Sequence, residues 1–410
     1  MKILFLTNYY PPHDLGGCEQ LCSEIAELMA ARGHEIQVLT SRHGVTSQMP
    51  TESDVIRTLH LETPVDYYRP MDLFLQRPRQ QRENRDLLER AIDDFEPDVV
   101  YVWGMWNLSR QLAYWAERRM SGRVAYTVAG YWFLPPDAHE AYWQLPARRW
   151  LSERLKGAIR PIALRKLERE KQAHPLQMEH VACVSHYVQE KMASAGALPR
   201  GARVIYNGID PQPYLNTTRR DRVDGELKLL YFGGILYDKG VHTAVEALGR
   251  LHAEGRDEGM RLTILGGGHP AYLARLRRLV VELGLVSRVE FHERIPRSEI
   301  PAFLGGFDAF LFTSIWEEPI ARTVMEAMAA GLVVIGTAVG GQREMLDDGV
   351  NALVFAPEDA KGLAEKITQI QHAPERLASL AEAGRRTVME RFTLERMADD
   401  VEAWLEEIVL

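Results

Sequence analysis

Two carboxylates in the carboxyl-terminal half of the chain are spaced so that they could hold both ends of one polyhydroxylated ligand. Glu318 precedes Pro319, and Glu326 lies in the following run of small and apolar residues, which Gly331 ends. Pro319 suits the first position of a helix, so the pattern predicts a helix that separates the two glutamates by roughly 12 Å. Ionised carboxylates only accept hydrogen bonds, which suits sugar or ribose hydroxyls. The structural alternative is an acidic helix start followed by one glutamate on the helix face.

A glycine-rich turn earlier in the same half supplies the opposite charge. Gly233 and Gly234 follow an apolar run, and Lys239 precedes Gly240 and a predicted helix from Val241. Glycine amides, a helix start and a lysine together attract an anion such as a phosphate. The spacing is not that of a Walker loop, and a purely structural turn is the alternative.

Two more turns contain glycines where a backbone could approach a ligand. Gly266 begins a run of three glycines after an apolar segment, and Gly16 and Gly17 lie in the loop 14–18 before a predicted helix. Glycine permits such close approach because it lacks a Cβ atom. A plain tight turn and an ordinary helix start explain these two features equally well.

Short apolar runs alternate with helical patterns in both halves, which is typical of parallel sheets covered by helices. A polar stretch after residue 207 suits a connection between two such domains. Ligands bind beyond the carboxyl ends of the strands in these sheets, which is where all four turns lie. The predicted strands are 3–7, 35–40, 98–103, 123–128 and 180–184 in the first half, and 227–232, 261–265, 288–291, 309–313 and 332–336 in the second.

The composition narrows the class of protein. A chain of 410 residues suits two domains, and its 57 acidic against 49 basic residues argue against a dedicated nucleic-acid binder. Its 3 cysteines form no metal-ligand pattern and favour a reducing compartment. Neither a secretory signal nor an apolar stretch of about 18 residues is evident, so we expect a cytoplasmic protein.

Taken in order, these motifs resemble the retaining glycosyltransferases of family 4 (glycosyl transferases group 1). The resemblance implies the GT-B fold, in which two Rossmann-like domains face each other across a cleft. It implies a first, acceptor-side domain of residues 1–206 plus 390–410 and a second, nucleotide-sugar-binding domain of residues 207–389. The motifs that carry the resemblance are Gly16-Gly17, Asn207-Gly208-Ile209-Asp210, Lys239-Gly240, Gly266 and Gly268, Thr313-Ser314, Glu318-Pro319, Glu326 and Gly340-Gly341.

The same resemblance implies roles for individual residues. Glu318 would bind hydroxyls of the transferred sugar, and Lys239 would bind the diphosphate; these two are the candidate catalytic residues. Glu326 would bind the ribose. The remaining implied donor-binding residues contribute mainly backbone, and they are Gly16, Gly17, Gly234, Gly266, Arg294, Ile295, Ile320, Ala321 and Arg322.

The implied reaction is a metal-independent transfer, with retention, of a hexosyl group from a nucleotide sugar to an unidentified hydroxyl. The donor would be a UDP-, GDP- or ADP-sugar, no further cofactor is implied, and the acceptor would be a glycan, a lipid-linked sugar or a small molecule. The alternative is a GT-B protein that hydrolyses or epimerises a sugar nucleotide, or that binds one without catalysis.

Two positions depart from the family pattern. Gly234 stands where the family usually has an arginine, so we hypothesise that Arg294 or Arg322 supplies the missing charge. Ala129 stands where the family often has a histidine close to the sugar. These departures keep the non-catalytic alternative open.

The first half also contains candidate acceptor and membrane contacts. Aromatic faces stack on sugar rings, although core packing explains most tryptophans. The segment 148–171 interleaves basic and apolar residues, a pattern that a solvated helix face explains and that is also compatible with a peripheral contact with an anionic membrane face. The tryptophans concerned are Trp103, Trp106, Trp115, Trp132, Trp143 and Trp150.

Overall fold

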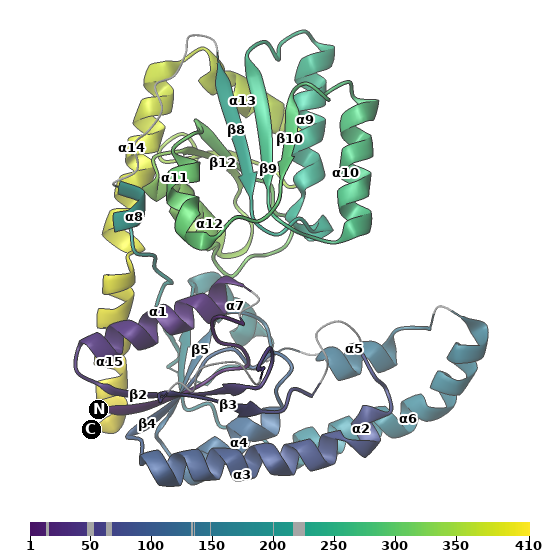
Figure 1. Cartoon of the computed structure of the whole chain (residues 1–410), viewed down its shortest axis with the longest axis vertical. Helices are drawn as coiled ribbons and strands as arrows, with labels where there is room; N and C mark the ends of the chain where they lie inside the picture. Colours follow the sequence, from purple (N-terminus) through teal and green to yellow (C-terminus); the bar gives the residue numbers. More distant parts are fainter. Residues whose placement is uncertain are drawn as a thin grey trace. The chain divides into compact units, whose positions relative to one another are not determined.

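The computed structural model describes residues 1–13, 16–46, 53–62, 68–132, 134, 136–147, 149–199, 201–215 and 226–410. The chain forms two compact units (Figure 1). The first comprises Met1–Val184, Val188–Ile205 and Ala398–Leu410, and the second comprises Ser185–Tyr187 and Tyr206–Met397. Ser185–Tyr187, Tyr206 and residues 390–397, which we expected in the first domain, thus lie in the second unit.

The first unit is built on a parallel sheet with the strand order β3-β2-β1-β4-β5-β6-β7. Residues Ile3 to Leu6 and Val99 to Val102 are fully buried, as expected for central strands covered on both faces. The strands are β1 (Lys2–Leu6), β2 (Glu35–Ser41), β3 (Val55–Leu59), β4 (Val99–Val102), β5 (Val124–Val128), β6 (His180–Cys183) and β7 (Arg203–Val204).

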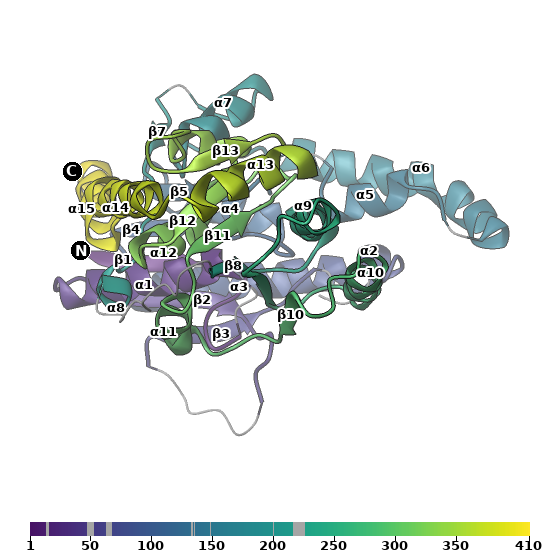
Figure 2. The ribbon, with the colours of Figure 1, turned by 90° about the horizontal axis from the view of Figure 1, so that it is seen from above.

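Helices cover this sheet, and one of them extends beyond it (Figures 1 and 2). The amino-terminal end of α6 projects past α5 and away from the strands in both views. The helices are α1 (Gly17–Ala31), α2 (Asp72–Leu75), α3 (Arg77–Phe95), α4 (Arg110–Arg119), α5 (Ala138–Gln144), α6 (Trp150–Ala173) and α7 (His186–Ser194). The last helix, α15 (Leu394–Val409), contributes residues 398–410, and its Glu402 forms an ion pair with Arg32 of the first unit, with Nη1 and Oε2 2.6 Å apart.

The second unit contains a parallel sheet with the strand order β10-β9-β8-β11-β12-β13. Its strands are β8 (Leu227–Phe232), β9 (Met260–Leu265), β10 (Val289–His292), β11 (Ala309–Phe312), β12 (Val333–Thr337) and β13 (Leu353–Phe355). Its α-helices are α8 (Gln212–Leu215), α9 (Val241–Ala253), α10 (Pro270–Glu282), α11 (Ile300–Leu304), α12 (Arg322–Ala329), α13 (Ala360–Gln371) and α14 (Pro374–Arg391). Short 3₁₀ helices span Tyr237–Lys239 (η1), Arg297–Glu299 (η2) and Gly340–Glu344 (η3).

The parallel α/β architecture predicted from the sequence is confirmed. Each of the ten predicted strands is present, with its ends shifted by one residue at most. The sequence pattern missed three strands: β3, which lies in a weakly periodic region, and β7 and β13, which have only two and three residues.

In each sheet, the side on which successive strands are added changes at one point. In the second sheet, β9 and β10 lie on one side of β8, whereas β12 and β13 lie beyond β11. The loops that leave β8 and β11 therefore diverge, and such a switch point is where ligands bind in open α/β sheets. The corresponding neighbours in the first sheet are β1 and β4.

Candidate functional site

Two of the predicted site residues meet at the switch point of the second sheet. Lys239 ends the turn after β8, and its Nζ forms an ion pair with Oε1 of Glu318, which follows β11. Ser314 Oγ donates a second hydrogen bond to the same oxygen at 3.1 Å. Lys239 Nζ also lies 4.8 Å from the centre of the Trp316 ring, within range of a cation–π interaction. A cation and a carboxylate thus share one small region beyond the strand ends.

Backbone contacts hold these two loops together. The amides of Ile315 and Trp316 donate to the Asp238 carbonyl oxygen at 2.8 and 3.0 Å, and Thr313 Oγ1 donates to the Lys239 carbonyl oxygen at 2.8 Å. Gly240 has a φ of +64°, and a Cβ atom there would lie only 2.1 Å from the Thr313 carbonyl oxygen. Glycine is therefore required where the loop turns into α9.

The three-glycine turn after β9 packs against the turn after β8. A Cβ atom at Gly266 would lie 2.0 Å from the Gly233 carbonyl oxygen, and one at Gly268 would lie 1.8 Å from that of Ile235. The Ile235 amide donates to the Gly267 carbonyl oxygen at 2.9 Å. These glycines permit close backbone approach, as expected, but the approaching group is the neighbouring loop.

Gly234 differs from these glycines. A Cβ atom there would meet only Leu236 Cδ1, at 3.9 Å, and its φ lies outside the left-handed region. The Tyr231 hydroxyl donates to the Gly234 carbonyl oxygen at 2.6 Å, and burial raises the pKa of Tyr231, which keeps this donor protonated. The position can therefore accept a side chain without backbone strain.

The helix predicted to start at Pro319 starts three residues later. α12 begins at Arg322, so Glu318 lies in an irregular loop and not at the helix start. This loop is held from outside the helix, because Ser185 Oγ and the Gly341 amide donate to the Pro319 and Glu318 carbonyl oxygens at 2.7 and 2.8 Å.

The start of α12 presents unsatisfied donors. Ala321 is the N-cap residue and has no side chain that can accept a hydrogen bond. Within the described part of the chain, the amides of Ile320 and Ala321 donate to no other residue. Together with the orphan amides of a helix start, they form a donor surface of the kind that binds anions and hydroxyl oxygens.

Glu326 lies inside a second charged cluster on α12. Its side chain is buried, and its Oε1 is 3.1 Å from Nη2 of the half-exposed Arg297. Tyr214 of α8 lies beside it; burial raises the pKa of Tyr214, and the Glu326 carboxylate raises it further. Arg322, also buried, lies near Tyr214. Sequence reasoning missed Arg297 and Tyr214, since neither belongs to a recognisable motif.

Arg294 and Ile295 follow β10 at the same edge of the sheet. Arg294 is exposed, and its side chain crosses Gly267, where a Cβ atom would lie 3.1 Å from its Nε. Its charge is therefore next to the glycine turn, whereas that of Arg322 belongs to the Glu326 cluster.

Gly16 and Gly17 belong to the first unit, whereas the residues just described belong to the second. Gly16 is the N-cap residue of α1, with extended backbone and no side-chain cap. Asp14 and Leu15 of the same loop lie outside the described residues. No group of three or more His, Cys, Asp or Glu side chains in the described part of the chain could hold a metal ion.

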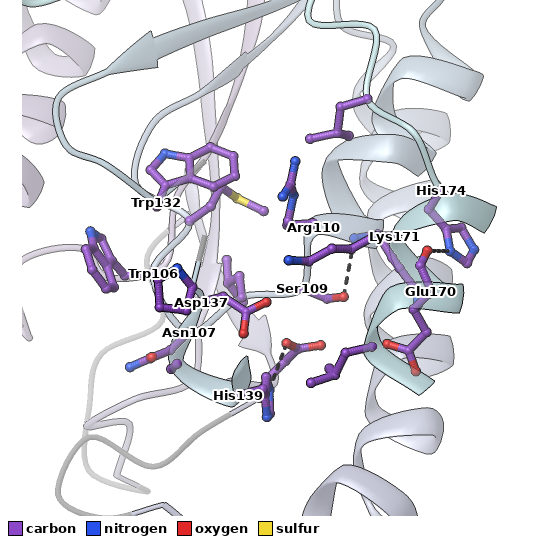
Figure 3. Close-up of a pocket in the computed structure, with 18 of the residues that line it drawn as sticks. Trp106, Asn107, Ser109, Arg110, Trp132, Asp137, His139, Glu170, Lys171 and His174 are labelled. Atoms are coloured by element: carbon purple, nitrogen blue, oxygen red, sulfur yellow. Dashed lines mark hydrogen bonds and ion pairs between the residues drawn. The ribbon is translucent and has the colours of Figure 1, made fainter. Parts of the chain in front are cut away.

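The first unit contains a pocket at the carboxyl ends of β4 and β5 (Figure 3). Trp106 and Trp132 lie on one side, and residues at the end of α6, among them Glu170 and His174, lie on the other. Trp103 and Trp143 are buried in the core, Trp115 stacks on Arg85, and Trp150 is exposed. Two of the six tryptophans therefore line a cavity.

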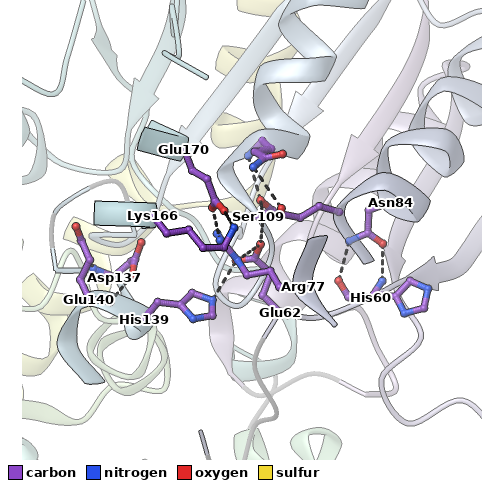
Figure 4. Close-up of polar contacts among 12 residues, drawn as sticks. His60, Glu62, Arg77, Asn84, Ser109, Asp137, His139, Glu140, Lys166 and Glu170 are labelled. Atoms are coloured by element: carbon purple, nitrogen blue, oxygen red, sulfur yellow. Dashed lines mark hydrogen bonds and ion pairs between the residues drawn. The ribbon is translucent and has the colours of Figure 1, made fainter. Parts of the chain in front are cut away.

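Several residues that line this pocket belong to one ionic network, whose contacts Figure 4 shows. Arg77 forms ion pairs with both Glu62 and Glu170, and Nε2 of His139 lies 3.3 Å from Glu62 Oε2. Burial alone would raise the pKa of Glu62, but Arg77 and His139 outweigh it and lower that pKa below its usual value. The carboxylate is thus held ionised, and it fixes the side chains around it.

Comparison with known proteins bears on the family and the fold of the chain. Residues 15–213 match the family described as Glycosyltransferase Family 4, and residues 218–387 match Glycosyl transferases group 1. The glycogen synthase of Mycobacterium tuberculosis is 26% identical over 97% of this chain and 92% of its own length. A glycosyltransferase from Rickettsia africae has a TM-score of 0.73 at 19% identity, covering 100% and 98% of the two chains. Anabaena HepE, solved in complex with UDP and glucose, has a TM-score of 0.69 at 21% identity, covering 99% of each chain.

Proposed function

The chain belongs to the glycosyltransferases of group 1 and has their GT-B fold, and from this premise we propose that it transfers a hexosyl group from a nucleotide sugar to a hydroxyl, with retention and without a metal ion. The observation that carries the proposal is the contact between Lys239 and Glu318 at the switch point of the second sheet. The anomeric carbon and the adjoining phosphate of a nucleotide sugar are only a few atoms apart. One cation and one carboxylate in contact suit the two sides of that bond.

The chemistry follows from where charge develops. As the bond between the anomeric carbon and the phosphate oxygen breaks, its electron pair passes to the diphosphate, and positive charge grows on the sugar. Lys239 and the free amides before α12 stabilise the departing diphosphate more than they stabilise the intact donor. The acceptor oxygen attacks the anomeric carbon from the face that the diphosphate leaves, and the diphosphate oxygen takes the acceptor proton.

Glu318 and Glu326 position the donor in this account. Glu318 accepts hydrogen bonds from hydroxyls of the transferred sugar, and its contact with Lys239 gives way as the diphosphate takes the lysine. Glu326 accepts hydrogen bonds from the ribose at the other end of the donor, beside Arg297. The backbone around Ile295 lines the base. A donor contact of Gly16 and Gly17 stays a prediction from the family resemblance.

We assign the compensating charge to Arg294. Gly234 removes the usual family cation, and Arg294 is the arginine whose side chain crosses the glycine turn. Arg322 is less suited to this role because it is buried near Tyr214.

The exposed face of α6 supports the proposed peripheral contact with an anionic membrane face. Its exposed residues follow helical spacing and mix large apolar with basic side chains; Leu155 is 70% and Trp150 67% exposed. Apolar side chains that enter the headgroup region, with arginines beside anionic lipids, are typical of helices that lie on membranes. No described helix is long and apolar enough to span a bilayer. Arg148 lies outside the described residues; the exposed stripe is Trp150, Leu151, Arg154, Leu155, Ala158, Pro161, Ile162 and Arg165.

A donor screen tests the proposal. The full chain is heated with UDP-, GDP- and ADP-hexoses, since a ligand that binds the folded state raises the melting temperature. We expect one base class to stabilise the wild type, with UDP the first probe because the Anabaena neighbour is a UDP complex. Glu326→Ala should weaken that binding by about 1–3 kcal/mol, the cost of lost hydrogen bonds.

A product assay with the donor that this screen selects separates the rival functions. Release of free sugar from the donor without any acceptor dependence would favour a hydrolase. Tight donor binding with neither transfer nor hydrolysis would favour a non-catalytic protein. If none of the three donor classes raises the melting temperature, the proposed function is wrong.

A further inference from the structure

Arg110 lines the first-unit pocket, and no described residue pairs with its charge. Arg110 is the first residue of α4 and is half-buried in the pocket wall. Among the described residues, its guanidinium forms neither a hydrogen bond nor an ion pair. Burial lowers the pKa of Arg110, although Asp137 and Glu140 act in the opposite direction from a distance. A buried arginine of this kind costs free energy until an anion reaches it.

The nearby carboxylates are already engaged. Asp137 caps α5, and its Oδ1 accepts from the Glu140 amide at 2.8 Å. Glu140 Oε1 lies 2.6 Å from Nζ of Lys171. Neither acid forms a hydrogen bond or an ion pair with Arg110, although Asp137 lines the same pocket and its charge acts on the guanidinium.

The other charges of the pocket compensate one another. Arg77 lies between the carboxylates of Glu62 and Glu170, and Lys166 Nζ is 2.5 Å from Glu170 Oε1 (Figure 4). This network is internally paired and buried, so it is rigid and leaves Arg110 as the group able to select a ligand by charge.

An aromatic wall faces the pocket beside this cation. Trp106 follows β4 and is 55% exposed, which is unusual for a tryptophan inside a folded unit. Trp132 follows β5 and is buried at the pocket wall (Figure 3). Flat aromatic faces stack on the apolar faces of sugar rings. The cavity volume of about 140 Å³ admits one carboxylate or phosphate group with part of the ring that carries it.

We infer that this pocket binds the acceptor through an anionic group, so that the acceptor is an acidic carbohydrate that carries a carboxylate or a phosphate. The anion pairs with Arg110, and the ring that bears it stacks on Trp106. This inference rests on the proposed function for the identity of the acceptor as a sugar, but the binding step requires no transfer.

The test measures binding of three probes to the full chain by calorimetry. Methyl glucoside is the neutral probe, methyl glucuronide carries a carboxylate, and glucose 6-phosphate carries a phosphate. We expect at least one anionic probe to bind about tenfold or more tightly than the neutral one. The anionic probe that binds more tightly shows whether the pocket prefers a carboxylate or a phosphate on the acceptor.

Single-residue variants test whether Arg110 causes the preference for anionic probes. Arg110→Gln should abolish the tighter binding of the anionic probe, and Arg110→Lys should keep part of it. Trp106→Ala should weaken the favoured probe several-fold, and Arg118→Gln, on the exposed far end of the same helix, should change nothing. Each variant is compared with wild type by its melting temperature, so that a folding defect is recognised.

Two results would overturn the inference: equal binding of neutral and anionic probes, or an anionic preference that survives in Arg110→Gln. Binding of a nucleotide sugar is measured separately, without acceptor. A chain that binds the donor but shows no anionic preference refutes only this inference. A chain that binds no donor refutes the proposed function, whatever the probes show.

Discussion

Lys239 and Glu318 form an ion pair although 79 residues separate them in the chain, because the loops that carry them leave the adjacent strands β8 and β11. The pair is largely buried, and Ser314 and Trp316 contact it from the same loop. Lys239 and Glu318 thus compensate each other's charge. A donor that binds between them replaces this ion pair by contacts of its own with each side chain.

Removing the lysine should affect the chemical step more than donor binding. Lys239→Ala should lower kcat about 10²- to 10³-fold, the range seen when one preorganised donor to a developing anion is lost. Steady-state transfer rates check this, with Lys361→Ala, an exposed lysine on α13, as the control. A Lys239→Ala enzyme with wild-type kcat would show that the lysine does not contact the leaving group.

Restoring the missing family cation should improve the enzyme. Gly234→Arg should tighten donor binding by about 1.5 kcal/mol, or more than tenfold, since a charged hydrogen bond to a phosphate is gained where the backbone tolerates a side chain. Titration of the donor by calorimetry measures this. Gly234→Gln, similar in length but uncharged, is the matched control. An unchanged Kd in Gly234→Arg would place the diphosphate elsewhere.

The glycine turn after β9 should tolerate much less. Gly266→Ala combines a φ of +146° with a Cβ atom 2.0 Å from the Gly233 carbonyl oxygen, so we expect a loss of about 3 kcal/mol or more. Gly234→Ala, in the adjacent turn after β8, should cost less than about 1 kcal/mol, because a Cβ atom there meets only Leu236 Cδ1 at 3.9 Å. Thermal melting of the two variants distinguishes strain at Gly266 from an equal loss of stability wherever alanine replaces glycine in these turns.

The network of the first unit should make stability depend on pH in the acid range. The pKa of Glu62 is lower in the folded protein than its unfolded value of 4.5, so its stabilising contribution is complete above that pH and declines as the pH falls. Glu62→Gln should cost about 3 kcal/mol at pH 7, because it breaks a buried ion pair with Arg77.

The difference between wild type and Glu62→Gln should be constant from pH 7 to pH 5.5. It should shrink by about 0.8 kcal/mol at pH 4, as the unfolded carboxyl takes up its proton. Melting temperatures of both proteins across this range measure it. A difference that grows toward pH 4 would mean that Glu62 is protonated in the folded protein.

The exposed face of α6 should control contact with anionic lipid. Replacing Trp150 and Leu155 together by alanine should weaken binding to phosphatidylglycerol vesicles at least tenfold, at about 1 kcal/mol for each partly buried side chain. Co-sedimentation at low salt measures this. Val286→Ala, which removes another side chain that is 68% exposed, is the control. Wild-type protein that stays in the supernatant at low salt would refute the membrane contact.

Strand positions and the glycine turns could be predicted from the sequence because both depend on local pattern. Buried parallel strands read as continuous apolar runs, and Gly240, Gly266 and Gly268 occur where loops must touch. The start of α12 could not be predicted in the same way. Tertiary hydrogen bonds to Glu318 and Pro319 override the preference of proline for the first helical position.

Pairings between distant residues were beyond sequence reasoning. Whether Glu326 meets Arg297 depends on how the loop after β10 folds over α12, and no motif reports that geometry. The pocket around Arg110 could not be predicted for the same reason, since its lining combines Glu62 and Arg77 with residues of the segments 105–111, 131–139 and 167–176. A lone arginine at the start of a helix carries no signal until its neighbours are known.

The most direct test of the account is a crystal structure of the full chain with a bound nucleotide-sugar donor. The account predicts that the diphosphate lies within hydrogen-bond distance of Lys239 Nζ, that the transferred sugar's hydroxyls reach Glu318, and that the contact between these two side chains has opened. A donor bound elsewhere, with Lys239 and Glu318 still paired, would contradict it.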